Sequence, residues 1–167
     1  MTSLPAAEPH VTSAPAHRRR AVAVLGAVSA GLLALSACDK PTPVVTITVG
    51  TDSVNSEASC YDEDKPLKAT EIQDCLQDDK DIESISVDPD ETVRFGVDKK
   101  IADEGWVILL NGQPATNPSK KTYMTLPGSA FFNPQLGIKG DDITISIAEG
   151  SGKDVHGLWS FKLKKDS

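Results

Sequence analysis

The sequence has few of the side chains that bind transition metals or assist a nucleophile. Its 167 residues include three His, three Cys and two Met, and beyond residue 37 only His156 and Met124 remain of the His and Met. A blue-copper site needs two His, one Cys and usually a weak axial Met, so the composition argues against copper electron transfer. A Ser or Cys nucleophile needs an adjacent base, and His156 is the only imidazole beyond residue 37.

Motifs of hydrolases and phosphate-binding proteins are missing or incomplete. The sequence contains no G-x-S-x-G nucleophile elbow. The run Gly150-Ser-Gly-Lys153 lacks the first Gly of a phosphate-binding loop and precedes Asp154 instead of Ser or Thr, so we interpret it as a β-turn. Acidic residues are numerous, but nothing in their spacing selects a carboxylate pair for glycoside hydrolysis. We therefore predict that the protein is not an enzyme and has no catalytic residues.

Two acidic runs, Asp78-Asp-Lys-Asp81 and Asp88-Pro-Asp-Glu91, offer the carboxylate oxygens that Ca²⁺ prefers. Neither run has the Gly that the sixth position of a calcium-binding loop requires. We interpret both as solvated turns, and we expect neither a metal nor a cofactor.

Residues 1–37 have the layout of an export signal. A segment rich in Pro, Ala, Ser and Thr leads to Arg18-Arg-Arg20, and an apolar and small-residue run then extends over residues 21–35. The sequence Leu35-Ser-Ala-Cys38 resembles the lipobox of bacterial lipoproteins, [LVI]-[ASTVI]-[GAS]-C, at all four positions. This resemblance implies that Cys38 is lipidated through its thiol and that cleavage then removes residues 1–37.

Other interpretations of this leader are weaker. Its fifteen-residue apolar run is short for a transmembrane helix, which needs about 20 residues. The adjacent Arg residues before Ala21 resemble a twin-arginine export signal. However, Ala21 and Val22 stand where bulky apolar residues are usual in such signals. We therefore favour general secretory export. The expected location is the extracytoplasmic face of the cell membrane, with the membrane as a partner through the lipid.

Removal of the leader leaves 130 residues with 14 basic and 23 acidic side chains, a net charge of −9. This length is enough for one domain with a hydrophobic core. Nucleic-acid binding depends on Lys and Arg that neutralise phosphates, so the acidic charge argues against it. We divide the processed chain into a lipidated Cys and tether, residues 38–43, and a domain over residues 44–167.

The cysteine count predicts a disulfide. If Cys38 carries a lipid, only Cys60 and Cys75 remain, in a compartment where disulfides form and persist. A metal site built on these two Cys lacks further ligands, because no His lies between residues 18 and 155. We therefore predict a Cys60–Cys75 bridge.

Alternation of apolar and polar residues, the period of a β-strand, dominates from Val44 onward. Asn111-Gly112 is the pair that a tight hairpin favours. We expect a loop over Thr51–Pro66, a short helix over Lys68–Gln77 with Thr70 as a candidate cap, and no regular pairing from Pro114 to Lys121. The expected strands contain residues 45–49, 85–87, 93–97, 106–110, 122–126, 143–147 and 159–163.

Seven short strands and one short helix predict an antiparallel β-sandwich, immunoglobulin-like or cupredoxin-like. The two Trp, Trp106 and Trp159, are expected to lie near each other in its core. Phe131 and Phe132 cannot both point inward along one strand. Both could cover the open end of the sandwich, which we favour, or one could form an exposed apolar contact for a partner.

Several segments together resemble small actinobacterial lipoproteins that are classified as a domain of unknown function. They are the leader, the Cys60/Cys75 pair, Glu91–Asp98, Gly105–Gly112, Lys121–Tyr123 and Gly157–Lys165. The resemblance implies a cell-envelope lipoprotein and carries over no binding or catalytic residue. We expect a binding or scaffolding module, and the alternatives are an accessory protein for a metal or small ligand and, less favoured, a carboxylate-dependent envelope hydrolase.

Overall fold

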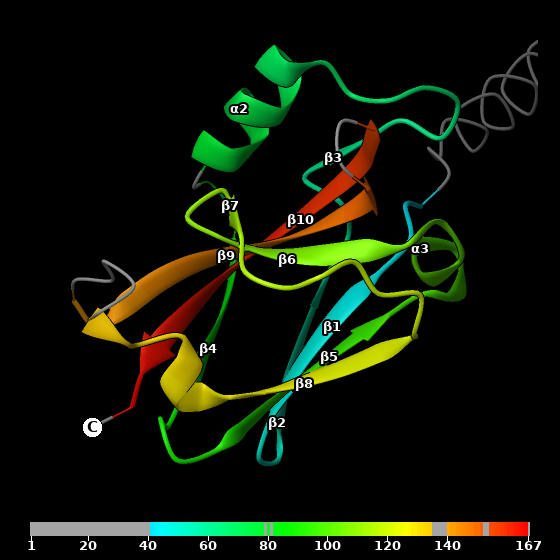
Figure 1. Cartoon of the computed structure of the whole chain (residues 1–167). Helices are drawn as coiled ribbons and strands as arrows, with labels where there is room; N and C mark the ends of the chain where they lie inside the picture. Colours follow the sequence, from blue (N-terminus) through cyan, green and yellow to red (C-terminus); the bar gives the residue numbers. More distant parts are fainter. Residues whose placement is uncertain (1–40, 79, 81, 135–139, 152–153, 167) are drawn as a thin grey trace, which may run out of the picture. The chain divides into compact units, whose positions relative to one another are not determined.

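The computed structural model describes residues 41–166 except 79, 81, 135–139 and 152–153. These residues form a sandwich of two β-sheets (Figure 1), as the sequence predicts. The first sheet has the strand order β2-β1-β5-β8, and every neighbouring pair in it is antiparallel. Its strands are β1 (Val45–Val49), β2 (Asp52–Ser56), β5 (Thr92–Val97) and β8 (Tyr123–Pro127).

The second sheet has the order β3-β10-β9-β6-β7, and β4 also pairs with β10. Strand β10 is antiparallel to β9 and β3 but parallel to β4, so β3 and β4 share one edge of this long strand. The strands are β3 (Cys60–Tyr61), β4 (Glu83–Val87), β6 (Trp106–Leu110), β7 (Gln113–Pro114), β9 (Asp142–Ser151) and β10 (Asp154–Lys165).

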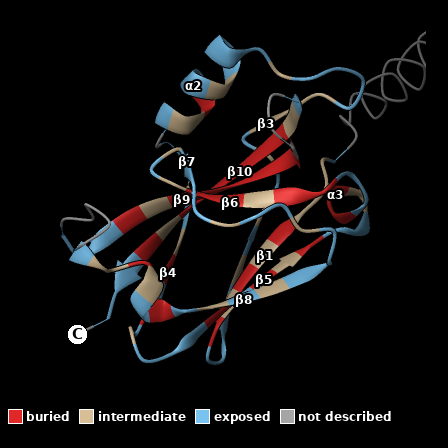
Figure 2. Ribbon diagram, in the orientation of Figure 1, coloured by how far each residue is buried: buried red, intermediate tan, exposed pale blue. Residues whose placement is uncertain are grey.

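The core lies between the two sheets because alternate residues of each strand point inward. Buried residues therefore alternate with exposed ones along the first sheet, whereas β9 and β10 are buried on both faces (Figure 2). Trp106 and Trp159 both have no exposed surface and belong to the same core cluster, so both lie in the core as expected. Burial of each large apolar side chain of this kind contributes roughly 1.5–3 kcal/mol, so this layer dominates the stability of the domain.

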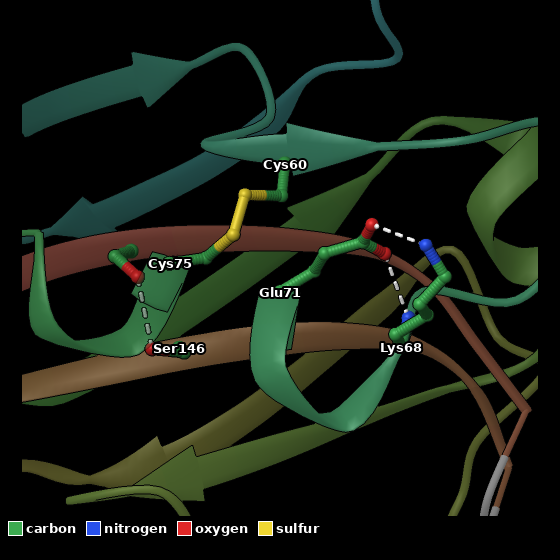
Figure 3. Close-up of a disulfide and its surroundings, with 6 residues drawn as sticks. Cys60, Lys68, Glu71, Cys75 and Ser146 are labelled. Carbon is green, nitrogen blue, oxygen red and sulfur yellow. Dashed lines mark hydrogen bonds and ion pairs between the residues drawn. A yellow bond between two sulfur atoms is a disulfide. The ribbon is translucent and has the colours of Figure 1, made fainter. Parts of the chain in front are cut away.

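Helix α2 (Ala69–Gln77) packs against the outer face of the second sheet. The disulfide between Cys60 and Cys75, with Cα atoms 6.2 Å apart, joins the helix to β3 (Figure 3). Leu109, Ala148 and Leu158 form the apolar surface against which the buried Cys75 packs. This cover explains why Ala148 of β9 and Leu158 of β10 are buried on the outer face of the sheet.

The turns agree with their sequences. Asn111 and Gly112 both have positive φ, 47° and 76°, in the connection between β6 and β7. This is the backbone of the tight hairpin that an Asn-Gly pair favours.

Several local expectations were wrong. The segment expected to be a loop holds β2 and β3, because an edge strand exposed to solvent needs no apolar alternation. Pro114 lies in β7, where it pairs with Leu109 at the sheet edge. Helix α2 is capped by Glu71, which accepts a hydrogen bond from the Lys68 backbone N–H at 2.8 Å, and not by Thr70.

Two further short helices, α3 (Lys99–Glu104) and the 3₁₀ helix η1 (Gly128–Ala130), were not anticipated. None of the helices in the described residues is long and apolar enough to cross a membrane.

Candidate functional site

The first described residues are fixed to the domain by hydrogen bonds at Thr42, Pro43 and Val44. The Trp159 indole Nε1–H donates to the carbonyl oxygen of Pro43 at 2.8 Å. The backbone N–H of Ala58 donates to the Thr42 hydroxyl at 2.8 Å, and that of Val44 donates to the Asp98 carboxylate at 2.8 Å. We call the end of the sandwich at which β1 begins, β5 ends and β8 begins, together with α3, the tether end.

Strands β1, β5 and β8 run side by side at the tether end (Figure 1). Thr46 pairs with Gly96 and Gly96 with Tyr123, so these three residues form one row across the first sheet. A second indole fixes the segment before β8, since Trp106 Nε1–H donates to the Lys121 carbonyl oxygen at 2.8 Å. Two buried Trp side chains therefore hold the chain on both flanks of this end.

Trp159 packs over the backbone of its own strand. A Cβ at Gly157 would lie 2.6 Å from the Trp159 ring and 2.8 Å from the Tyr61 ring. The two rings contact each other at a tilted angle, with their centroids 6.0 Å apart. Only glycine therefore leaves the space that lets the indole reach Pro43.

A charged group lies over the Tyr61 ring. Lys100 Nζ lies 5.3 Å from the centre of the Tyr61 ring and 2.7 Å from the Glu63 carboxylate. The hydrogen bond with Glu63, followed by contact with Tyr61, raises the pKa of Lys100 above its ordinary value. The ammonium thus stays protonated while it bridges α3 and the segment after β3.

Glu149 is the unusual polar residue of this region. It pairs with Trp106 on one side and Gly157 on the other, so it faces the core, and its exposed fraction is 1%. Among the described residues, its Oε2 is the one buried side-chain oxygen or nitrogen without a hydrogen-bond partner. Burial raises the pKa of Glu149, and the charges of His156 and Lys100 only partly oppose this rise.

The acid–base candidates of this region, His156 and Glu149, are limited by bonding and by burial. His156 Nδ1 lies 3.2 Å from the Asp62 carbonyl oxygen, which occupies that nitrogen. A buried carboxylic acid can donate a proton only to a group that reaches it, and 1% exposure leaves Glu149 almost no access. No group of three or more His, Cys, Asp or Glu within the described part of the chain is arranged to hold a metal ion.

The structure places Phe131 and Phe132 over the core, the interpretation that the sequence favours. Phe131 is 1% exposed and its ring lies 5.9 Å from that of Phe95, while Phe132 is half-buried against the same cluster. Phe131 also forms part of the floor of a groove of about 440 Å³ between the free edges of the two sheets. Neither Phe131 nor Phe132 therefore presents a fully exposed ring for contact with a partner.

The remaining candidates are ordinary turns where they are described. Asp88 Oδ1 accepts a hydrogen bond from the Asp90 N–H at 2.8 Å, and Asp78 Oδ1 accepts one from the Lys80 N–H at 3.2 Å. Cys38 and the whole leader lie outside the described residues, as do two Asp of the first acidic run and Gly152-Lys153 of the glycine-rich turn.

Neither the fixed tether nor the role of Glu149 was expected from the sequence. Both depend on pairings between distant residues, and the only local signal was a Glu within the apolar alternation of β9. Comparison with known proteins adds no function, because no family model, no curated protein and no solved structure matches the chain.

Proposed function

We propose that the protein is a lipid-anchored module of the bacterial cell envelope, held by Cys38 at the outer face of the cytoplasmic membrane. The observation that carries this proposal is the lipobox Leu35-Ser-Ala-Cys38, which stands only four residues before Thr42. A diacylglyceryl group provides the anchor, since acyl chains contribute roughly 0.8 kcal/mol per buried methylene and two chains bind stably.

The disulfide supports the same compartment. Bridges such as Cys60–Cys75 persist outside the cytoplasm and are rare within it. The acidic domain would also be repelled by an anionic bilayer, so the lipid and not surface charge must supply the membrane affinity.

Within the envelope, we propose a recognition or scaffolding role and not catalysis. The burial of Glu149, which shields it from substrates, and the contact of His156 with the Asp62 carbonyl oxygen support this proposal. Cross-linking in intact membranes would identify the protein that it contacts. Turnover of an envelope substrate by the purified domain, lost in Glu149→Gln, would contradict the non-enzymatic role.

Growth with an alkyne-bearing fatty acid tests the anchor. The parent protein should incorporate the label, and Cys38→Ala should not. The matched control is the double variant Cys60→Ala/Cys75→Ala, which retains Cys38 and should be labelled like the parent. Label on Cys38→Ala, or none on the parent, would contradict lipidation at this position.

A further inference from the structure

We propose that the tether end of the sandwich faces the lipid bilayer and that Tyr123, with Lys121 beside it, contacts the lipid headgroups. This inference rests on the proposed lipid anchor and adds the orientation of the domain. The partner of this surface is then the same bilayer into which the lipid on Cys38 inserts.

The first step is the length of chain between Cys38 and the domain. Thr42, Pro43 and Val44 are bonded to Ala58, Trp159 and Asp98. Thr42 is four positions after Cys38, and four steps of extended chain span at most about 14 Å. The lipidated residue therefore stays within about 14 Å of the point where the chain is fixed to the domain.

The second step is the position of Tyr123. It lies two strands from Thr46 in the row Thr46–Gly96–Tyr123, a separation of about 10 Å at the usual strand spacing. The opposite end of the first sheet, with Thr51 in the β1–β2 turn, lies five residues beyond Thr46, about 17 Å further along β1 at the usual rise per residue. The tether is therefore long enough for the first end to meet the bilayer and too short for the opposite end to do so.

The third step is the chemistry of the surface. Tyr123 is 66% exposed, and it is the exposed large hydrophobic residue of the described chain. Tyrosine is enriched at membrane interfaces because its ring is apolar and its hydroxyl is polar.

The basic residues next to Tyr123 differ in their bonding. Lys120 Nζ binds the Asp103 carbonyl oxygen at 3.1 Å. Lys121 is exposed, and its backbone rather than its side chain makes the described hydrogen bonds. Its ammonium is therefore available for a lipid phosphate.

Tryptophan quenching by brominated lipids tests the orientation. Lipidated Tyr123→Trp and the control Thr51→Trp would be placed in vesicles of phosphatidylcholine and phosphatidylglycerol with brominated acyl chains, and the parent signal subtracted. Both positions are exposed, and Trp106 and Trp159 are fully buried, so a common background is expected. Unchanged urea midpoints would show that both variants fold.

The expected result is several-fold stronger quenching at position 123 than at position 51. Equal quenching, or stronger quenching at position 51, in protein that floats with the vesicles would overturn the orientation and leave the anchor intact. If the protein purified from native membranes carried no lipid on Cys38, the anchor and the orientation would be overturned together.

Discussion

The indole of Trp159 and the carbonyl of Pro43 are joined by a 2.8 Å hydrogen bond, although the two residues are 116 positions apart in the chain. Trp159 has no exposed surface, so its N–H needs a partner inside the protein. Pro43 supplies that partner from the segment between the lipobox and β1. The segment is therefore part of the folded domain, which shortens the tether to the residues before Thr42.

Trp159→Phe tests this relationship. The variant keeps an aromatic ring but loses the bond to Pro43, at a cost of about 1 kcal/mol. Hydrogen exchange should become faster at the amides of Val44 and Ala58, which hold the same segment. The matched control is Trp106→Phe, which loses the bond to Lys121. Equal acceleration of both amides in the two variants would contradict a specific fixing of the tether.

Gly157→Ala should destabilise the domain, because the new Cβ would collide with the Trp159 and Tyr61 rings. Overpacking of this kind costs about 1–3 kcal/mol, and urea unfolding would measure it. Gly96→Ala is the control, since the nearest atoms to its Cβ are 3.9 Å away on Thr46. Similar midpoints for the two variants would show that the rings do not require glycine.

Replacement of both Cys60 and Cys75 by Ala should lower the free energy of unfolding. The bridge closes a loop of 15 residues, and the entropic model assigns about 3 kcal/mol to such a loop. Urea unfolding with and without a reductant would check this value. The reductant should lower the urea midpoint of the parent and leave that of the double variant unchanged. An equal shift of both midpoints would show that the reductant acts on something other than the bridge.

Glu149 should make stability depend on pH. Because burial raises its pKa above the ordinary value of 4.5, the folded state holds the proton more tightly than the unfolded state. Its contribution is therefore fully present below pH 4.5 and is lost as the pH rises through the folded pKa.

Glu149→Gln cannot ionise, so this loss should disappear and the variant should exceed the parent in stability at neutral pH. Urea midpoints measured from below pH 4.5 to neutral pH would show the effect. The control is Glu83→Gln, at an exposed position. Parallel pH profiles for the parent and Glu149→Gln would contradict a pKa of Glu149 that burial raises.

The sequence predicted the parts of the fold whose signal is local. Strand β5 shows strict alternation, with Val93, Phe95 and Val97 buried, and Asn111-Gly112 forms the expected turn. The cysteine count identified the disulfide without reference to structure. These features could be predicted because short-range patterns determine burial and turn geometry.

Other features have no local signal. Strand β2 has the sequence Asp52-Ser-Val-Asn-Ser56 and is mostly exposed at a sheet edge, so it carries no apolar pattern. Helix α3 has six residues, which is too short for a helical period to be recognised. The bond between Trp159 and Pro43 depends on the final packing of the two sheets, which the sequence pattern does not contain.

Intact-mass spectrometry of the protein purified from native membranes tests the central claim, lipid anchoring at Cys38, most directly. The account predicts the mass of residues 38–167 with a diacylglyceryl group, which should increase by the mass of two hydrogen atoms when Cys60–Cys75 is reduced. An uncleaved or unmodified chain would contradict the claim and leave the Cys38 thiol free for other chemistry.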